Sequence, residues 1–165
     1  AQGWVLDGVV SQSLAQTRAL WRLREDISET LWHWQPYKND ISVRVSKMPD
    51  FLAEVDQLVA ARYPDFEIVW YGHIGDGNLH LNILKPEDLP QTEFFERCGI
   101  VSLEIGELLA RYGGSISAEH GVGLLKKSLL PYSRSPVEIA LMRSIKKTFD
   151  PKSILNPGKV FDALV

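Results

Sequence analysis

The sequence lacks the features that mark several large classes of protein. It has one cysteine, Cys98, so no disulfide can form within the chain. No apolar run approaches the ~18 residues of a membrane-spanning helix, and no charged segment followed by an apolar one marks a signal peptide. Lysine and arginine (18) nearly balance aspartate and glutamate (21), without a basic stripe for nucleic acid. These absences predict a cytoplasmic protein that has no transmembrane segment and binds no nucleic acid.

The length and composition are those of one folded domain. The 165 residues are 45% hydrophobic and 24% charged, which is ordinary for a globular chain and too apolar for a disordered one. A chain of this size buries roughly 68–70% of the surface that its unfolded form exposes, so a substantial core is expected. Cys98 falls at an apolar position of a helical pattern and is expected to belong to that core.

Hydrophobic periodicity predicts helices and strands in alternation. The elements are, in order, a helix over 11–34, a strand over 41–45, a helix after Pro49, strands over 67–71 and 79–84, a helix over 91–112, a short strand over 115–117 and a helix from Ser135 to Asp150. The last helix opens on a capping box, in which Ser135 and Glu138 satisfy each other's backbone N–H groups. Helices beside a pair of strands joined by a tight turn predict the α+β class, with an antiparallel sheet backed by helices.

The first helix contains candidate binding residues. Its apolar positions recur at helical spacing and predict a buried face: Leu20, Leu23, Ile27, Leu31 and Trp34. Arg24 and Ser28 lie four residues apart beside that face. An arginine there can bind a carboxylate with two hydrogen bonds, and Lys38 is a second cation of interest. Alternatively, Arg24 pairs with a neighbouring acidic residue and Lys38 is solvated.

Two histidines flank a glycine-rich turn at residues 72–78. If this turn is the tip of a hairpin with residues 76–77 at its end, His73 lies opposite His80. The Cβ atoms of such a cross-strand pair are about 4.5–5.5 Å apart. Two imidazoles at that separation can share one zinc-sized ion, whose bonds to nitrogen are about 2.0–2.1 Å long.

A carboxylate completes a candidate metal site. His120 follows Glu119 in a second glycine-flanked loop. Two histidines and a carboxylate leave one coordination position open, as a catalytic metal site requires. These ligands suit Zn, Mn or Fe alike. A turn held only by hydrogen bonds is the alternative, and the sequence contains no HExxH, phosphate-loop, dinucleotide or nucleophile-elbow motif that would indicate another chemistry.

Three longer motifs occur in series. They are GHIGDGNLH at 72–80, SAEHGVG at 117–123, and FDP followed by LNPGK between 149 and 159. In this order they resemble the C-terminal domain of FAD-linked oxidases of the D-lactate dehydrogenase, glycolate oxidase and D-2-hydroxyglutarate dehydrogenase type. The resemblance extends from about Asp7 to Phe161, and three motifs in series are far more specific than any one of them.

The resemblance implies a fold and an activity. The domain would be a cap of ferredoxin-like derivation, placed over a flavin that a separate N-terminal domain of the same protein binds. The whole enzyme would oxidise a small D-2-hydroxyacid to the 2-oxoacid, with FAD as hydride acceptor and a divalent metal, Zn or Mn. A bound cation would lower the pKa of the substrate hydroxyl, and a general base would take its proton.

The resemblance also implies roles for individual residues. The metal ligands of the family match His73, His80 and Glu119, and the candidate general base beside the substrate hydroxyl matches His120. The positions that contact the substrate match Arg24, Ser28, Lys38 and Asn82. A tail that approaches the flavin in members of the family matches Asn156 and Lys159.

The short length limits what this chain can do alone. We expect residues 1–165 to form a cap that is truncated on its N-terminal side and lacks the FAD-binding domain, so the isolated chain should be inert. Two cations, Arg24 and Lys38, favour a dicarboxylate substrate such as 2-hydroxyglutarate. A homodimer is a possible assembly, and the sequence names no electron acceptor. The alternatives are a metal- or ligand-binding module that has lost redox activity, and a small metal-dependent hydrolase.

Overall fold

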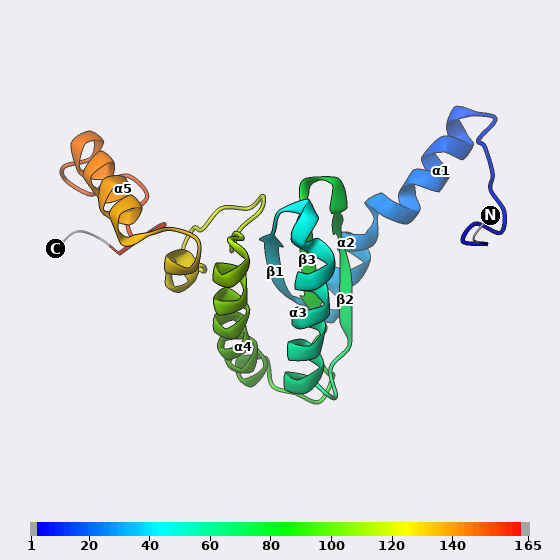
Figure 1. The fold of residues 1–165 in the computed structure, drawn as a ribbon, viewed down its shortest axis with the longest axis horizontal. Coiled ribbons are helices and arrows are strands. Elements are labelled where there is room, and N and C mark those ends of the chain that lie inside the picture. Colours follow the sequence, from blue (N-terminus) through cyan, green and yellow to red (C-terminus); the bar gives the residue numbers. More distant parts are fainter. Residues whose placement is uncertain (1–2, 163–165) are drawn as a thin grey trace. The chain divides into compact units, whose positions relative to one another are not determined.

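Two compact units make up the chain. The computed structural model describes residues 3–162, and the division between the units falls between Gln35 and Pro36. The first unit is helical, and the second contains a sheet and the remaining helices (Figure 1). Every helix within residues 3–162 is too short or too polar to cross a lipid bilayer.

The first unit consists of α1 (Leu14–Glu25), α2 (Ile27–Leu31) and the 3₁₀ helix η1 (Trp32–Trp34). The prediction of one helix over 11–34 is therefore wrong, because the helix breaks at Asp26. The backbone of Asp26 has φ −81° and ψ 0°, and its carboxylate pairs with Arg22 at 2.9 Å. Aspartate competes for backbone hydrogen bonds and so favours helix ends over helix interiors.

The prediction that the first helix has a buried apolar face is also wrong for α1. Leu20 and Leu23 are exposed, and α1 contains no buried residue. Of the five positions in the predicted stripe, Leu31 alone is buried. A helix needs a second layer of structure to cover its apolar stripe, and a short helical unit supplies none for α1.

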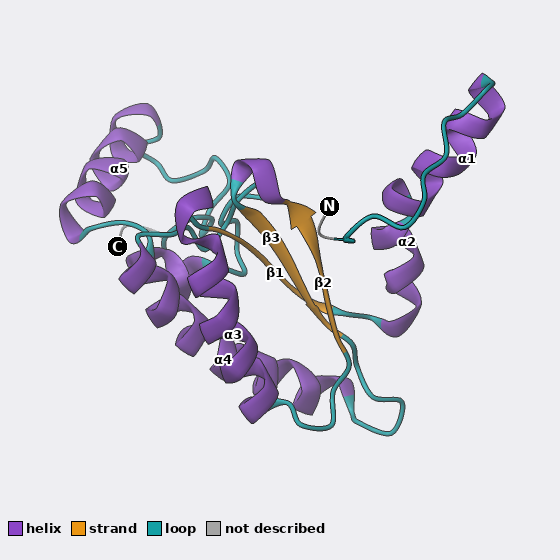
Figure 2. Cartoon of the chain, turned by 45° about the vertical axis from the view of Figure 1, so that its right-hand side comes forward, coloured by secondary structure: helices purple, strands orange, loops and turns teal. Residues whose placement is uncertain are grey.

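An antiparallel sheet of three strands forms the centre of the second unit. The strand order is β1 (Tyr37–Ser42), β3 (Asn78–Ile83) and β2 (Ile68–His73). Two helices, α3 (Met48–Arg62) and α4 (Gln91–Tyr112), pack side by side on one face of this sheet (Figure 2). The predicted α+β class, with an antiparallel sheet backed by helices, is confirmed.

The core lies between the sheet and these two helices. Alternate strand residues such as Ile41 and Leu81 point into it, where they meet Phe51 of α3 and Phe94 of α4. Alternation along a strand places the intervening residues on the opposite face. Cys98 of α4 is fully buried in this core, as predicted.

Burial also suppresses the reactivity of Cys98. It raises the pKa of the thiol to about 11, so the nucleophilic thiolate is scarce at neutral pH. We therefore expect that a thiol reagent leaves the folded protein unmodified and labels one thiol per chain after unfolding in urea. Rapid labelling of the folded chain would contradict the placement of Cys98 in the core.

The strand predicted over 41–45 is wrong in its bounds, since β1 covers residues 37–42 instead. The chain leaves the ladder because the N–H of Val43 donates to the carbonyl of Gly77, in the turn between β2 and β3, at 3.0 Å. The strand predicted over 115–117 is reduced to an isolated bridge to the end of β1.

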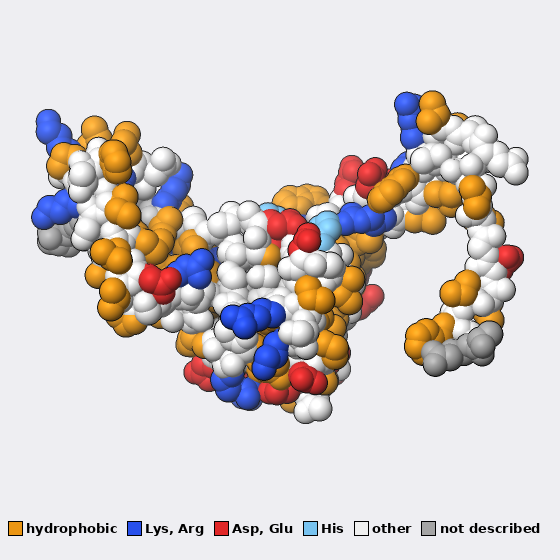
Figure 3. Space-filling model, turned by 45° about the horizontal axis from the view of Figure 1, so that its top comes forward, with side chains coloured by type: hydrophobic (Ala, Val, Ile, Leu, Met, Phe, Trp, Pro, Cys, Tyr) orange, Lys and Arg blue, Asp and Glu red, His pale blue; other side chains and the backbone are white. Residues whose placement is uncertain are grey.

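Two further helices follow in the chain, η4 (Lys127–Tyr132) and α5 (Pro136–Phe149). The predicted capping box is confirmed, because the Ser135 hydroxyl accepts the N–H of Glu138 and the Glu138 carboxylate accepts the N–H of Ser135. No residue of α5 is buried, and apolar side chains lie on its surface (Figure 3): Val137, Leu141, Ile145 and Phe149.

A buried hydrogen-bonded group joins α4 to β1. The hydroxyl oxygen of Ser102 lies 3.0 Å from Asn39 Oδ1 and 3.1 Å from the Tyr37 hydroxyl. Ser102→Ala leaves both groups without this partner, so we expect a loss of about 1–3 kcal/mol in the free energy of unfolding. The matched control, Ser144→Ala on the exposed surface of α5, should change that free energy by less than about 0.5 kcal/mol. Urea unfolding compares the two variants, and equal midpoints would contradict the prediction.

Candidate functional site

The face of the sheet away from α3 and α4 is polar. Strand pairing places Asp40 of β1, His80 of β3 and Tyr71 of β2 side by side in one row. Their neighbours Ile41 and Leu81 point into the core on the other face. The side chains of this row therefore lie outside the apolar core.

The hairpin register differs from the predicted one. His73 pairs with Asn78, so the prediction that it lies opposite His80 is wrong. The connection contains the 3₁₀ turn η3 (Ile74–Asp76) and then Gly77 in the left-handed conformation, which makes it longer than the predicted two-residue tip. The two histidines still lie on one face as diagonal neighbours, with ring centroids 5.7 Å apart.

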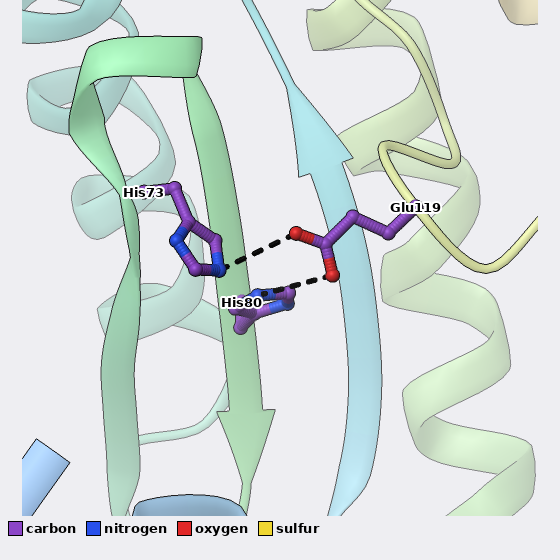
Figure 4. A group of neighbouring side chains, drawn as sticks. All are labelled: His73, His80 and Glu119. Atoms are coloured by element: carbon purple, nitrogen blue, oxygen red, sulfur yellow. Dashed lines mark ion pairs between the residues drawn. The ribbon is translucent and has the colours of Figure 1, made fainter. Parts of the chain in front are cut away.

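Glu119 reaches both histidines from the loop that follows the Ser115 bridge. Its Oε1 lies 3.3 Å from His73 Nε2, and its Oε2 lies 4.0 Å from His80 Nε2 (Figure 4). One ligand atom of each side chain lies within 4.8 Å of the other two. The side-chain amide of Asn78 donates a hydrogen bond to Oε1 and so fixes the carboxylate. The structure therefore brings together the three residues predicted as metal ligands.

A buried aspartate connects β1 to the same loop. Asp40 is 2% exposed, and its Oδ2 accepts the backbone N–H groups of Glu119 and His120, each at 3.0 Å. Lys126 Nζ lies 3.7 Å from the same oxygen. Burial alone would raise the pKa of Asp40, but the two N–H donors and Lys126 outweigh it and hold that pKa below its ordinary value. The carboxylate is therefore ionised at neutral pH.

His80 lies between two carboxylates. Its Nδ1 is 3.5 Å from Asp40 Oδ1, and its Nε2 faces Glu119. Burial lowers the pKa of His80, and the opposing effect of the two carboxylates does not cancel it. The imidazole is therefore neutral at neutral pH, which is the form that binds a metal.

Three other predicted site residues, His120, Lys38 and Asn82, belong to the sheet or to the loop of Glu119. The side chain of His120 is 62% exposed, and its Nδ1 lies 3.6 Å from Asp40 Oδ2. Its ring centroid is 6.1 Å from that of His80. Lys38 and Asn82 pair in the next row of the sheet, beside the row of His80. Asn82 is fully buried, and its amide donates to the carbonyl of His80 at 3.2 Å.

Two predicted substrate contacts belong to the first unit. Arg24 lies near the end of α1 and Ser28 lies in α2, on either side of the break at Asp26. The helix predicted to carry both residues is therefore interrupted between them.

The predicted flavin contacts lie in the tail after α5. Lys159 Nζ donates to Asn156 Oδ1 at 2.8 Å. One residue further, the N–H of Val160 donates to the carbonyl of Gly123 at 2.8 Å. The tail is thus attached to the loop that begins at Glu119.

Sequence reasoning missed three residues around the cluster, Asp40, Asn78 and Lys126. One signal was available for Asp40, because a charged residue stands among the alternating positions of β1. Asn78 occurs inside the histidine motif, but its contact with Glu119 spans 41 residues of chain. No local pattern reveals a contact of that separation.

The fold and the cluster define the class of protein, an α+β domain with a His₂–Glu group on the polar face of its sheet. Comparison with known families makes the assignment specific. Residues 1–160 match the family described as FAD linked oxidases, C-terminal domain, and the chain belongs to this family. The resemblance found in the sequence motifs is confirmed.

Several curated relatives carry the same name. A D-2-hydroxyglutarate dehydrogenase of Stutzerimonas stutzeri is 62% identical over 98% of this chain and 35% of its own length. One of Xanthomonas citri is 58% identical over 98% of this chain and 34% of its own length. The mitochondrial D-2-hydroxyglutarate dehydrogenase of Arabidopsis thaliana is 41% identical over 96% of this chain and 27% of its own length. The chain thus spans about a third of the length of the relatives that it matches.

Proposed function

We propose that this chain is the C-terminal, substrate- and metal-binding part of an FAD-dependent D-2-hydroxyglutarate dehydrogenase. The observation that carries the proposal is the cluster of His73, His80 and Glu119 on the polar sheet face of an FAD-linked oxidase domain. The names of the relatives support the substrate, and their greater length supports an FAD-binding part in the same protein. The 165-residue chain alone would then oxidise no 2-hydroxyacid.

The three side chains of the cluster fit a divalent metal. Zinc binds histidine nitrogen and carboxylate oxygen at about 2.0–2.2 Å, so two ligand atoms on one ion lie at most about 4.4 Å apart. Each histidine lies within this limit of one carboxylate oxygen, with His73 Nε2 at 3.3 Å from Oε1 and His80 Nε2 at 4.0 Å from Oε2. One ligand atom of each side chain lies within 4.8 Å of the other two, so a small adjustment of the side chains would bring all three onto one ion. Neutral imidazole and carboxylate suit Zn or Mn. Three protein ligands leave a position for the substrate.

The residues around the cluster supply binding and proton transfer. When bound, a metal supplies Lewis acidity at the 2-hydroxyl, and FAD supplies the hydride acceptor. His120 takes the hydroxyl proton. Its Nδ1 faces Asp40, so Nε2 is the nitrogen left to act on the substrate. The ionised Asp40 stabilises the imidazolium that this step creates.

A second group of residues binds the substrate carboxylates. Lys38 lines a cavity of about 420 Å³ at the edge of β1. Its ammonium group complements a carboxylate of an acid such as 2-hydroxyglutarate. Arg24, Ser28 and Asn82 keep in this proposal the substrate-binding roles that the family resemblance implies.

The tail completes the proposed assignment. Asn156 and Lys159 would contact the flavin of the whole protein. The hydrogen bond of the adjacent Val160 to Gly123 supports this role, because it holds the tail beside the loop of Glu119 and His120.

Substrate profiling of the full-length, FAD-loaded protein with added Zn²⁺ or Mn²⁺ tests the proposed function. We expect oxidation of D-2-hydroxyglutarate in preference to D-lactate and glycolate. Lys38→Met should raise the KM for D-2-hydroxyglutarate by roughly 10- to 100-fold, because a charge-assisted hydrogen bond contributes about 1.5–3 kcal/mol. Its effect on D-lactate should be smaller, since that acid has no second carboxylate.

Lys147→Met on the exposed surface of α5 is the matched control, and its KM should not change. Equal activity with D-lactate and D-2-hydroxyglutarate would contradict the proposed substrate. A full-length protein that binds metal and FAD and oxidises no 2-hydroxyacid would contradict the proposed reaction.

A further inference from the structure

We propose that Asp40 is a positioning residue of this site, whose one buried carboxylate fixes both the metal ligand His80 and the loop of Glu119 and His120. This inference deepens the proposed function and depends on it for the role of the metal. It concerns a residue that binds neither metal nor substrate in the proposed mechanism. Asp40 would act through the side chains that do.

The first argument is the burial of a charge. Asp40 is 2% exposed and lies in the middle of β1. Burying an ionised carboxylate is unfavourable, and an apolar residue of similar volume is often neutral or better for stability at such a position. The sheet itself does not need a carboxylate there, because the pairing of Asp40 with His80 in the ladder uses backbone groups. The presence of a charged residue at position 40 is therefore explained by the groups that its carboxylate contacts.

The second argument is that the two carboxylate oxygens of Asp40 have different contacts. Oδ2 accepts the N–H groups of Glu119 and His120 and lies near Lys126. Oδ1 is buried, and within residues 3–162 no hydrogen bond reaches it. The polar atom that faces Oδ1 in an ion pair is His80 Nδ1, at 3.5 Å. A small movement of the imidazole would convert this contact into a hydrogen bond.

The third argument concerns the two ring nitrogens of His80. A neutral imidazole has one N–H and one free lone pair, and the group that accepts from the N–H decides which nitrogen is free. A carboxylate can only accept, and His80 has one on each side. Asp40 Oδ1 lies closer, at 3.5 Å from Nδ1, whereas Glu119 Oε2 is 4.0 Å from Nε2 and beyond hydrogen-bond reach, so Asp40 favours the proton on Nδ1. The lone pair then lies on Nε2, which faces Glu119 at 4.0 Å. Asp40 thus presents to a metal the nitrogen that belongs to the cluster.

The fourth argument is that the same carboxylate fixes the loop. Two consecutive N–H groups, from Glu119 and His120, point at one oxygen of Asp40. The Ser117 hydroxyl lies 3.4 Å from that oxygen as well. The backbone of the loop is therefore fixed relative to β1 and β3. Through these bonds the Asp40 side chain contributes to the distance between Glu119 and His80.

The variant Asp40→Asn tests the effect of Asp40 on His80 while it preserves an acceptor for the N–H groups of the loop. The loop N–H groups require an acceptor, so the amide oxygen takes the place of Oδ2 and the amide NH₂ takes the place of Oδ1. That NH₂ would donate to His80 Nδ1, which moves the imidazole proton to Nε2 and blocks the ligand atom. We expect Zn²⁺ binding to weaken by roughly 10- to 100-fold, the usual effect of removing a group that orients a metal ligand.

The test uses the full 165-residue chain and two readouts. Long-range ¹H–¹⁵N spectra of the metal-free chain assign the tautomer of His80, and competition with a chelator measures the affinity for Zn²⁺. Asp150→Asn is the matched control, because Asp150 is also buried, accepts two backbone N–H groups and pairs with a lysine. This control should change neither the tautomer nor the affinity.

The expected result is an Nδ1–H tautomer in the wild-type chain, a change to Nε2–H in Asp40→Asn, and weaker Zn²⁺ binding in that variant alone. An Nε2–H tautomer in the wild-type chain would overturn the inference without any variant. Wild-type Zn²⁺ affinity in a folded Asp40→Asn chain would also overturn it. Failure of the wild-type chain to bind Zn²⁺ contradicts the proposed metal site, and the tautomer still decides the role of Asp40.

Discussion

Gly77→Ala is expected to destabilise the second unit and to abolish metal binding in the same variant. Gly77 has φ +72°, and a Cβ atom at this position would lie 1.9 Å from the carbonyl oxygen of Val43. The left-handed conformation costs a residue with a side chain about 1–2 kcal/mol, and the contact with backbone adds to it because backbone cannot rotate away. The free energy of unfolding should therefore fall by at least about 2 kcal/mol.

The same substitution should displace both histidines, because Gly77 closes the turn between them. The carbonyl of Gly77 accepts the N–H of Val43, which ties the turn to the end of β1. Loss of this closure alters the β2–β3 register that keeps His73 and His80 on one face. Calorimetric titration with Zn²⁺ should then show no saturable binding.

Gly75→Ala provides the control for this prediction. Gly75 lies two residues earlier in the same turn, and a Cβ atom there would meet no atom within 4 Å. Its free energy of unfolding should change by no more than about 0.5 kcal/mol, and Zn²⁺ binding should persist. Urea unfolding measures the difference in the free energy of unfolding between the two variants, provided that this free energy depends equally on urea concentration in both. Equal stability of the two variants would show that the turn is not closed as described.

Glu119→Gln is expected to remove the metal while it preserves the fold. The amide keeps the size of the side chain, but it lacks the charge of a carboxylate ligand. Glu119 is half exposed and lies in a loop, so the free energy of unfolding should change little. The Zn²⁺ affinity should fall by more than the roughly 10- to 100-fold that follows when a supporting residue is removed.

Glu107→Gln, on the exposed surface of α4, is the matched control for charge. Equilibrium dialysis of both variants against Zn²⁺ measures the effect. The wild-type affinity in Glu119→Gln would mean that any metal bound by the chain lies elsewhere. In the full-length protein the same variant should lose turnover of D-2-hydroxyglutarate.

The sequence predicted correctly the elements that are determined by interactions between residues close together in the chain. Helix α4 has the predicted bounds because its apolar periodicity is regular and Gly113 ends it in the left-handed conformation. The capping box of α5 needs no more than four consecutive residues, 135–138. The break at Asp26 was missed because the apolar stripe continues in sequence across it.

Contacts between distant segments could not be predicted in the same way. The register of the hairpin depends on whether the turn has two residues or four, and glycine permits either. The bonds of Asp40 to the loop of Glu119 span 79 and 80 residues of chain. The motifs identified the ligands of the candidate site, whereas the group that supports them became visible only in the folded chain.

Anaerobic reduction of the flavin by D-2-hydroxyglutarate, measured in one turnover of the full-length protein, tests the central claim most directly. The protein is compared before and after its metal is removed with a chelator, with and without Zn²⁺ or Mn²⁺ added back. We expect rapid loss of the oxidised-flavin absorbance with metal, little reduction without it, and recovery on addition. Reduction at the same rate in the metal-free protein, or no reduction by D-2-hydroxyglutarate in the metal-loaded one, would contradict the account.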